Sequence, residues 1–265
     1  MGKSTTARMR LFCGAGAIAL SLASAANAAD QAEAYEIEAV TVTAQKRTQD
    51  TLDVGVNVAV VTSETLQARR VGQVTDIAAF TPNVEIKENM PGILPVVTIR
   101  GVGLNDFSVT NNPSAGVYVD EVYLSSLALM NFDLFDLERM EALKGPQGTL
   151  YGRNSTAGAI NIVTAKPRIG VLEGRVAGGY GTYETAELEG MVNLPVSDTL
   201  ALRLAGKAIK QDEGFYFNRA VDRDIGRREI GMGRAQLLWE PNEDLEVLVK
   251  LEVQKSRSEV GGPEF

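Results

Sequence analysis

Apolar and polar residues alternate with a period of two along the chain after residue 167. Successive side chains of a β-strand point to opposite faces, so this pattern predicts strands with one apolar and one polar face. Leu172–Tyr180 fits the pattern loosely, and four later segments fit it closely. Their opposed faces are Ala186, Leu188, Val192 and Leu194 against Glu187, Glu189 and Asn193; Leu200, Leu202 and Leu204 against Arg203 and Lys207; Ala235, Leu237 and Trp239 against Arg234 and Gln236; and Leu245, Val247, Val249 and Leu251 against Glu246, Lys250 and Glu252.

The links between these segments alternate in length. Pro195–Thr199 and Pro241–Asp244 are short, whereas the link from Gln211 to about Arg228 is long and charged. Short turns at one end and long loops at the other are typical of a transmembrane β-barrel, and Trp239 lies where an interfacial aromatic residue is expected. A soluble β-sandwich shows similar alternation. The pattern therefore leaves both architectures open.

The preceding stretch of the chain, residues 48–167, mixes helical and strand patterns. Ser63-Glu64 opens a short helix, and a second helix is predicted from about Gln73 until Thr81-Pro82 ends it. Short β-branched or aromatic runs predict strands at Pro95–Arg100, Gly116–Tyr123 and Ala159–Thr164, with Asp120-Glu121 as a hairpin turn inside the second. Glu138–Lys144 alternates weakly between apolar and polar residues and is interpreted as a further strand. Such a mixture predicts an α+β globule.

The N-terminus carries an export signal. Lys3, Arg8 and Arg10 precede the apolar run Leu11–Leu22, which is followed by small residues ending in Ala26-Asn27-Ala28. The run is too short to cross a hydrocarbon core as a helix, so residues 1–28 are interpreted as a signal peptide cleaved between Ala28 and Ala29. Residues 29–47 are rich in Ala, Glu and Gln and are expected to form a flexible arm.

Composition excludes several classes of function. Cleavage leaves 23 basic and 34 acidic residues, a net charge of −11, which disfavours nucleic acid as a partner. The chain has no histidine, and its one cysteine, Cys13, lies in the signal peptide. Catalytic triads, thiolate metal sites and disulfides are therefore not expected in the mature chain, and the sequence predicts neither an enzyme nor a cofactor.

One long motif carries a family resemblance. LERMEALKGPQGTLYGRNSTAGAINIVTAKP, residues 137–167, resembles the end of the plug domain of TonB-dependent outer-membrane receptors. TPNV at 81–84, TIRG at 98–101 and GVYVDEVYL at 116–124 support it, and EAVTVTAQ at 38–45 resembles the TonB box. The resemblance runs from about Ile37 to the end of the chain. The sequence departs from the usual family pattern at Ala142, where Val is common, and at Lys144, where Arg is usual and only Arg offers a bidentate fork.

The resemblance implies both a fold and a function. Residues 48–167 would be the plug, and residues 168–265 would be about five strands of a 22-stranded transmembrane barrel, too few to close it. The intact protein would then import a scarce nutrient across the bacterial outer membrane, with ferric siderophore as the preferred cargo and cobalamin, haem or oligosaccharide as rivals. Its partners would be TonB with its inner-membrane energising complex, the cargo and outer-membrane lipid. The alternative is a soluble periplasmic module, made of the plug alone, that binds or regulates.

The resemblance also nominates residues. TonB would bind by adding a strand to the segment Glu38, Ala39, Val40, Thr41, Val42, Thr43 and Ala44, which we expect to be extended and unpaired. Contacts between plug and barrel are expected from Arg100, Glu138, Arg139, Glu141, Lys144 and Arg153. A Gly- and Asn-rich stretch with Asn105, Asp106, Asn111 and Asn112 is the candidate cargo contact. GVGLND and GPQGTLYG lack residues that phosphate-binding loops require and are rejected as nucleotide sites.

Overall fold

The computed structural model describes the chain in segments, and Val40–Phe265 form one compact unit. The described residues are 41–42, 49–50, 55–88, 95–104, 111–125, 132–219 and 222–259. The predicted signal peptide, with its cleavage position between Ala28 and Ala29, lies outside them. Among the described residues, no helix is both long and apolar enough to cross a membrane.

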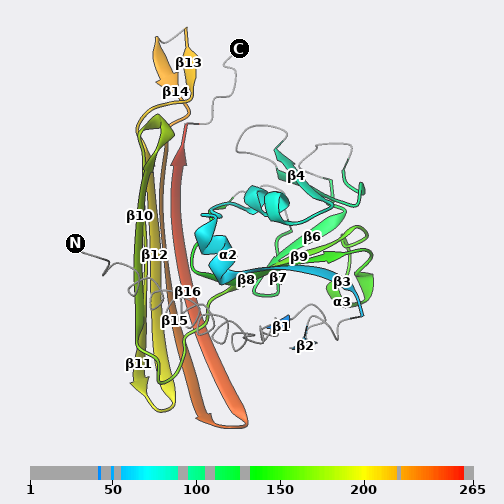
Figure 1. Ribbon diagram of the computed structural model, residues 1–265, viewed down its shortest axis with the longest axis vertical. Helices are drawn as coiled ribbons and strands as arrows, with labels where there is room; N and C mark the ends of the chain where they lie inside the picture. The colour runs from blue at the N-terminus through cyan, green and yellow to red at the C-terminus, as the bar shows by residue number, and fades with distance from the viewer. Residues whose placement is uncertain are drawn as a thin grey trace, which may run out of the picture. The chain divides into compact units, whose positions relative to one another are not determined.

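A five-stranded sheet, here called the mixed sheet, organises the first half of the described chain (Figure 1). Its strand order is β3-β8-β9-β6-β7, and only the β6–β9 pair is parallel. A separate hairpin joins β4 to β5. The bounds are β3 Asn57–Thr62, β4 Val84–Glu88, β5 Pro95–Ile99, β6 Ala115–Val119, β7 Val122–Tyr123, β8 Leu137–Lys144 and β9 Gly158–Thr164. The predicted strands and the α+β class are confirmed, whereas β3 and β4 were not predicted from the sequence.

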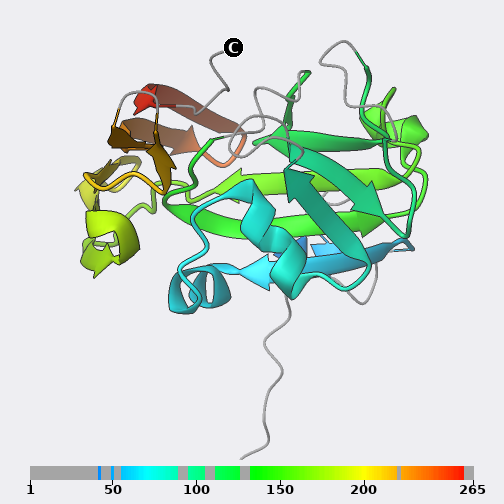
Figure 2. The ribbon, with the colours of Figure 1, turned by 90° about the horizontal axis from the view of Figure 1, so that it is seen from above.

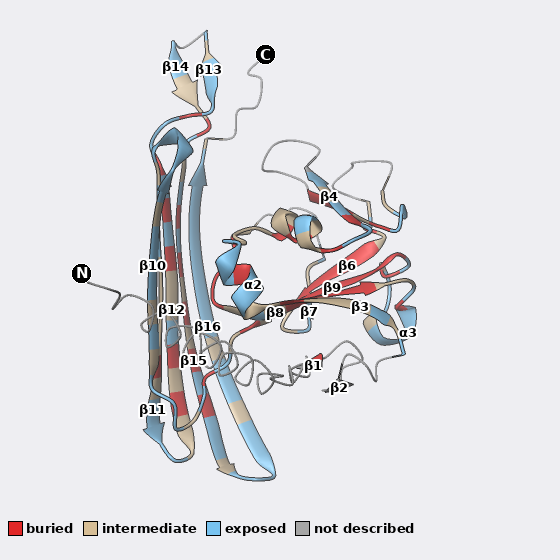
Figure 3. Cartoon of the chain, in the orientation of Figure 1, coloured by how far each residue is buried: buried red, intermediate tan, exposed pale blue. Residues whose placement is uncertain are grey.

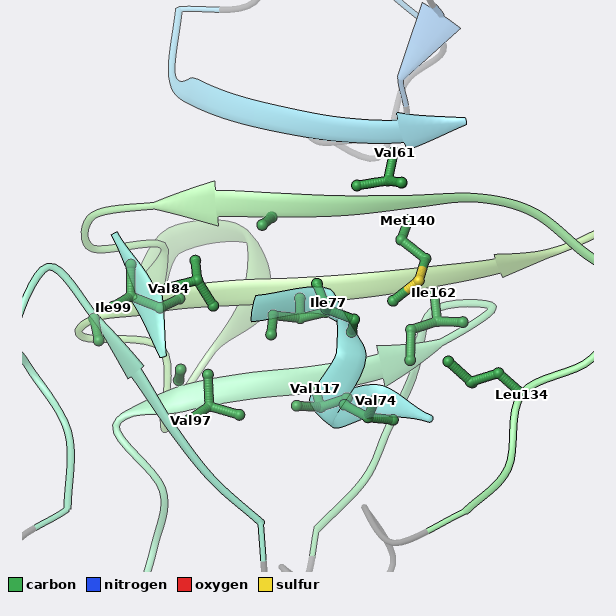
Figure 4. Packing of buried hydrophobic residues seen from close by; sticks show 14 of the residues in the cluster. Val61, Val74, Ile77, Val84, Val97, Ile99, Val117, Leu134, Met140 and Ile162 are labelled. Atoms are coloured by element: carbon green, nitrogen blue, oxygen red, sulfur yellow. The ribbon is translucent and has the colours of Figure 1, made fainter. Parts of the chain in front are cut away.

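Two short helices cover one face of the mixed sheet (Figure 2). Helix α2 spans Ser63–Ala68, and η1, a 3-10 helix, spans Val74–Phe80 and begins with a capping box between Gln73 and Asp76. The predicted helix positions are confirmed. Figure 4 shows Val74 and Ile77 of η1 packed against side chains of β5, β6, β8 and β9. This apolar core gives the globule an interior of its own.

The opposite face of the mixed sheet has a smaller apolar cluster. Val42, Tyr118, Leu143 and Ala159 are buried together there. Helix α3, Gly148–Tyr151, places Tyr151 against this cluster, with its ring centroid 4.9 Å from that of Tyr118. Two-residue strands β1, Thr41–Val42, and β2, Gln49–Asp50, pair beside it. The mixed sheet is therefore covered by apolar side chains on both faces.

A second five-stranded sheet, here called the meander, has the order β10-β11-β12-β15-β16, and all its pairs are antiparallel. Its bounds are β10 Glu173–Gly181, β11 Thr185–Ser197, β12 Leu200–Gln211, β15 Arg228–Asn242 and β16 Leu245–Ser258, with η3, Thr182–Glu184, before β11. The five predicted strands are present. The long link predicted after Gln211 contains a further hairpin that the sequence analysis missed, β13 Tyr216–Asn218 with β14 Arg223–Ile225.

Burial alternates along β12 and β15, the two strands of the meander that carry most of its buried residues, as the sequence predicted (Figure 3). On β12, Arg203 and Lys207 are buried, whereas Leu204 is 40% exposed. On β15, Arg234 and Gln236 are buried while Trp239 is 45% exposed. The face that carries these polar residues is thus the covered one, where Ile209, Ile230 and Met232 also pack against Phe135, and the face with Leu204 and Trp239 is open. Because a water-soluble sheet buries its apolar face, this inversion indicates that the meander is built for other surroundings.

Candidate functional site

Four polar side chains form a row across the covered face of the meander. Asn193 lies opposite Arg203, Arg203 opposite Gln236, and Gln236 opposite Lys250, so the row crosses β11, β12, β15 and β16. The period-two alternation of each strand brings the four to the same face. Each of them bonds to the chain outside the meander strands, so we call this set the cross-strand row.

Arg203 makes the most buried ion pair of the row. Its Nε and Nη2 donate to the two carboxylate oxygens of Asp136 at 2.8 and 2.6 Å, and both side chains are less than a tenth exposed. Asp136 lies at the start of β8 with a φ of 48°, a conformation that residues other than glycine adopt rarely. The bidentate pair is a strong, directional contact that holds Asp136, with its strained backbone, against β12 of the meander.

Arg234, two residues along β15 from the row, also contacts the segment before β8. Its Nε donates to Glu252 on the neighbouring strand at 2.7 Å, while Nη1 donates to the carbonyl oxygens of Phe135 and Asp136 at 3.3 and 3.2 Å. Its guanidinium lies 4.3 Å from the centre of the Phe135 ring. Lys207 adds a bond to the Leu134 carbonyl oxygen at 3.2 Å. Residues 133–136, here called the anchor loop, are therefore gripped from two strands.

Lys250 and Gln236 reach a different part of the mixed sheet. Lys250 Nζ donates to Asp120 Oδ2 at 2.6 Å, and Asp120 also accepts from the backbone N–H and hydroxyl of Thr164 at 2.8 and 2.7 Å. Gln236 Nε2 donates to the Thr164 hydroxyl at 3.3 Å. Burial by itself raises the pKa of Asp120, but the bonds from Lys250 and Thr164 outweigh it and hold that pKa below its ordinary value. Asp120 therefore stays ionised in this contact.

Asp120 and Glu121 form the turn between β6 and β7, and both have positive φ, 46° and 68°. Two successive left-handed residues match a type I′ hairpin turn, which favours Asn or Asp followed by Gly. The predicted hairpin turn at Asp120-Glu121 is present, and its backbone is unfavourable for Glu121. The bonds of Asp120 to Thr164 and Lys250 help to keep this turn in place.

Asp133 begins the anchor loop, and Arg228 of β15 lies 3.8 Å from it. Burial raises the pKa of Asp133, and the charges of Arg228 and Lys207 offset only part of that rise.

Asn193, at the other end of the row, accepts from the Arg168 N–H at 2.9 Å and donates to the Arg168 and Val171 carbonyl oxygens. Asn193 thereby fixes the link that enters β10.

The comparison with known families decides what this pair of sheets is. A family model described as the TonB-dependent receptor plug domain matches residues 50–159. Residues 50–159 therefore belong to the TonB-dependent receptor family. The mixed sheet with its helices is the plug, and the meander resembles strands of the receptor barrel. The predicted family and fold class are confirmed.

Named relatives agree with this assignment. The pesticin receptor of Yersinia enterocolitica is 31% identical over 163 residues, which are 61% of this chain and 23% of that receptor. The vitamin B12 transporter BtuB of Photobacterium profundum is 29% identical over 202 residues, 71% of this chain and 32% of the transporter. The crystal structure of the ferric yersiniabactin uptake receptor FyuA from Yersinia pestis has a TM-score of 0.67 and 27% identity, covering 76% of this chain and 32% of that chain. The chain thus spans a third or less of these relatives.

The six residues nominated for plug–barrel contact lie elsewhere in the plug. Arg139 pairs with its neighbour Glu138 and, at 2.8 Å, with the buried Glu141, so these contacts are internal to β8. Lys144 ends β8, where burial and the nearby charge of Arg100 lower its pKa. Arg100 has a φ of 53° after β5, and Arg153 is exposed after α3. The contacts described here for Arg139, Glu138 and Glu141 lie within the plug, and the role of all six in contacting the barrel stays a prediction.

The sequence pattern did not reveal the plug partners of the row, Asp120, Asp136 and Thr164, nor Asp133, which lies near Arg228. It had assigned Arg203, Lys207, Arg234, Gln236 and Lys250 to the polar faces of their strands. Buried cations need carboxylates, which is a signal for acidic partners in the plug. It does not say which carboxylates, because Asp136 is 67 residues from Arg203 and Asp120 is 130 residues from Lys250.

One expectation about the TonB-box segment is wrong. Thr41–Val42 was expected to be unpaired, but it pairs with Gln49–Asp50, and Val42 is fully buried beside Tyr118, Leu143 and Ala159. Apolar residues remote in sequence supply the packing partners that the flanking sequence lacks. The other nominated TonB-binding residues, Glu38, Ala39, Val40, Thr43 and Ala44, lie outside the described residues.

The nominated cargo contacts are only partly described. Asn105 and Asp106 lie outside the described residues, whereas Asn111 and Asn112 lie before β6. The exposed Asn112 accepts from Asn154 Nδ2 at 3.5 Å, and the same amide donates to the Tyr123 hydroxyl at 2.7 Å. Asn112 is thus tied to the turn after α3, and its contact with cargo stays a prediction.

Proposed function

We propose that the intact receptor takes up a ferric siderophore across the bacterial outer membrane, driven by TonB and its inner-membrane energising complex. In this proposal residues 48–167 act as the plug, residues 168–265 begin the transport barrel, and residues 29–47 are the arm that carries the TonB box. The plug closes the pore until TonB pulls on the arm. The signal peptide, cleaved between Ala28 and Ala29, provides export.

The exposed apolar face of the meander carries this proposal. Large apolar side chains on this face are Val176 (79% exposed), Leu188 (58%), Leu204 (40%), Leu237 (37%), Val249 (58%), Leu251 (66%) and Val253 (63%). They lie on all five strands and form a continuous surface that water would not favour. Outer-membrane lipid covers such a surface, because barrel strands face hydrocarbon with one side and the lumen with the other. A soluble plug-only module has no use for it.

The cross-strand row supports the gating role of the plug. Its contacts with Asp136 and Asp120 combine charge with hydrogen-bond geometry, and a small apolar cluster of Phe135 with Ile209, Ile230 and Met232 lies beside them. Polar contacts of this kind exchange with water more readily than an apolar interface does, because water replaces their bonds. The plug is thus held firmly at rest and separates from the meander when TonB applies force.

Val42 gives the TonB-box proposal a specific step. A partner strand can pair with Glu38–Ala44 only after Thr41–Val42 leaves Gln49–Asp50, and Val42 must leave its apolar cluster at the same time. Docked, the segment is protected from pairing with other chains. TonB binding therefore requires release of Val42 from Tyr118, Leu143 and Ala159.

The cargo proposal draws on the relatives. One solved relative is a ferric yersiniabactin uptake receptor, and another relative is a vitamin B12 transporter. Ferric siderophore is therefore the first candidate cargo, and cobalamin is the second. We propose Asn105, Asp106, Asn111 and Asn112 as cargo contacts, because short polar side chains on a loop supply hydrogen bonds to a bulky polar ligand.

Substitution of Val42 tests the proposal in the intact receptor. Val42→Pro removes one backbone donor and fixes φ near −65°, so strand addition by TonB should fail and energy-dependent uptake of labelled ferric siderophore should fall to background. Cargo binding at the cell surface and insertion into the membrane should remain normal. Val42→Ala keeps the backbone donor and is the matched control, with a milder effect.

Full uptake by Val42→Pro would show that this segment is not the TonB box. Cell fractionation tests the wider proposal, since the protein belongs in the outer-membrane pellet. A soluble periplasmic pool would contradict the transport function and favour the plug-only module. Saturable binding of cobalamin with no binding of ferric siderophore would transfer the proposal to the second cargo.

A further inference from the structure

Arg203 is a buried cation of the meander whose carboxylate partner belongs to the plug. The guanidinium is 6% exposed and forms its bidentate pair with Asp136 of the anchor loop. By contrast, Lys207 on the same strand lies 2.7 Å from Glu187 and 3.9 Å from Glu189, both on β11. When the plug moves, Lys207 keeps its carboxylates and Arg203 loses Asp136.

Two further cations of the meander lie near Arg203. Lys250 is in the same cross-strand row, and Arg234 lies two residues from Gln236 on β15. Glu252 of β16 is close to both of them, at 2.7 Å from Arg234 and 3.4 Å from Lys250. With the plug displaced, three cations would share this one carboxylate, and the Nε2 donor of Gln236 would be released from Thr164. The local excess of positive charge and donors is suited to an anion.

The position of Asp136 shows which anion shape fits. Its two carboxylate oxygens accept one N–H each from Arg203, which is the planar fork that a guanidinium offers to a carboxylate. A cavity of about 140 Å³ reaches this position and is lined by Asp136, Phe135 and Lys207 among others. The cavity therefore lies beside Asp136, the residue that occupies the guanidinium of Arg203.

We propose that Arg203, Arg234, Gln236 and Lys250 form a latent carboxylate-binding site, which Asp136 and Asp120 occupy at rest and which a carboxylate group of the cargo occupies once the plug has moved. This inference rests on the proposed function and assigns the cargo to carboxylate-bearing compounds. The physical reason is that a buried guanidinium without an anion is costly, so the open pore is stabilised by a passing carboxylate.

Removal of the resident carboxylate tests the site directly. Asp136→Gly suits the positive φ at this position and keeps the backbone carbonyl that Arg234 uses. In the intact receptor in detergent micelles, calorimetric titration should show citrate binding to Asp136→Gly and at least about tenfold weaker binding to wild type. Asp136→Gly/Arg203→Lys keeps the charge but loses the fork, so its citrate affinity should again fall about tenfold.

Asp136→Asn, a neutral isostere, provides a second measurement. Citrate should raise its melting temperature and leave that of Asp136→Asn/Arg203→Met unchanged, while the uncharged trimethyl citrate should have no effect on either. Equal citrate affinity in wild type and Asp136→Gly, or no binding to either, would overturn the inference. Inorganic phosphate binding as tightly as citrate would overturn the assignment to carboxylate.

Uptake of labelled ferric siderophore by wild-type cells, measured in parallel, separates the two proposals. If Asp136→Gly does not bind citrate while wild-type cells keep energy-dependent uptake, only the latent site is overturned. Absence of uptake in wild type would overturn the proposed function, even where the purified variants bind citrate.

Discussion

The strands of the mixed sheet are covered on both faces, whereas the meander has one covered and one open face. In the mixed sheet, Ile160 and Ile162 of β9 are fully buried against η1, and Leu143 is buried on the other face. In the meander, Arg203 is buried and Leu251 is 66% exposed. The comparison teaches that period-two alternation specifies a two-faced strand, and that its surroundings decide which face is covered.

The difference predicts which region folds alone. Residues 48–167 enclose an apolar core and should melt cooperatively as an isolated soluble domain, whereas residues 168–265 expose apolar surface and sheet edges in water and should aggregate. Circular dichroism melts and solubility of the two separate fragments check this. A cooperative transition in isolated 168–265 would show that the meander has a core of its own and would remove the contrast.

The contact between the two regions should be the next most sensitive point. Arg203→Met leaves Asp136 buried without its cation, which is expected to cost about 3–5 kcal/mol of stability in the intact receptor. Asp136→Gly combined with Arg203→Met should recover much of the loss, because no unpaired charge remains. Denaturant melts of Arg203→Met, Asp136→Gly and the double variant measure the coupling free energy of the pair. Additive losses of stability would mean that the two side chains act independently.

Truncation of apolar side chains should separate the two regions. Ile160→Ala deletes fully buried atoms of the plug core and should cost about 2–5 kcal/mol. Leu251→Ala on the open face of the meander should cost about 0.5 kcal/mol, since under the proposed function it exchanges one apolar side chain that faces lipid for a smaller one. Equal losses in thermal melts of the intact receptor would show that Leu251 is packed against protein.

The smallest effect should be a pH dependence at Asp120. Its pKa in the folded protein is lowered, so its contribution to stability is fully present above its unfolded pKa, near 3.8, and is lost as pH falls through the folded value. Lys250→Met should reduce this acid sensitivity by removing one bond to the carboxylate. Melts between neutral and acidic pH compare the two proteins, and identical profiles would show that Lys250 does not stabilise ionised Asp120.

The sequence predicted much of the fold but only half of each contact. Ser63 and Thr81-Pro82 marked helix ends through local backbone preferences, and the alternation placed Arg203, Arg234 and Lys250 on one face. These signals are local, because they depend on residues within a turn or a strand. The β13–β14 hairpin was missed because polar, charged residues surround its short strands.

What the sequence determined by itself is the family, through the motif at 137–167, and the two-faced character of each strand. Tertiary structure alone decided that Asp136 meets Arg203, that Asp120 meets Lys250, and that Val42 is buried under Tyr118. The physical reason is that local backbone preference and periodicity act over a few residues. A salt bridge or an apolar cluster instead depends on which distant strands the complete packing brings side by side.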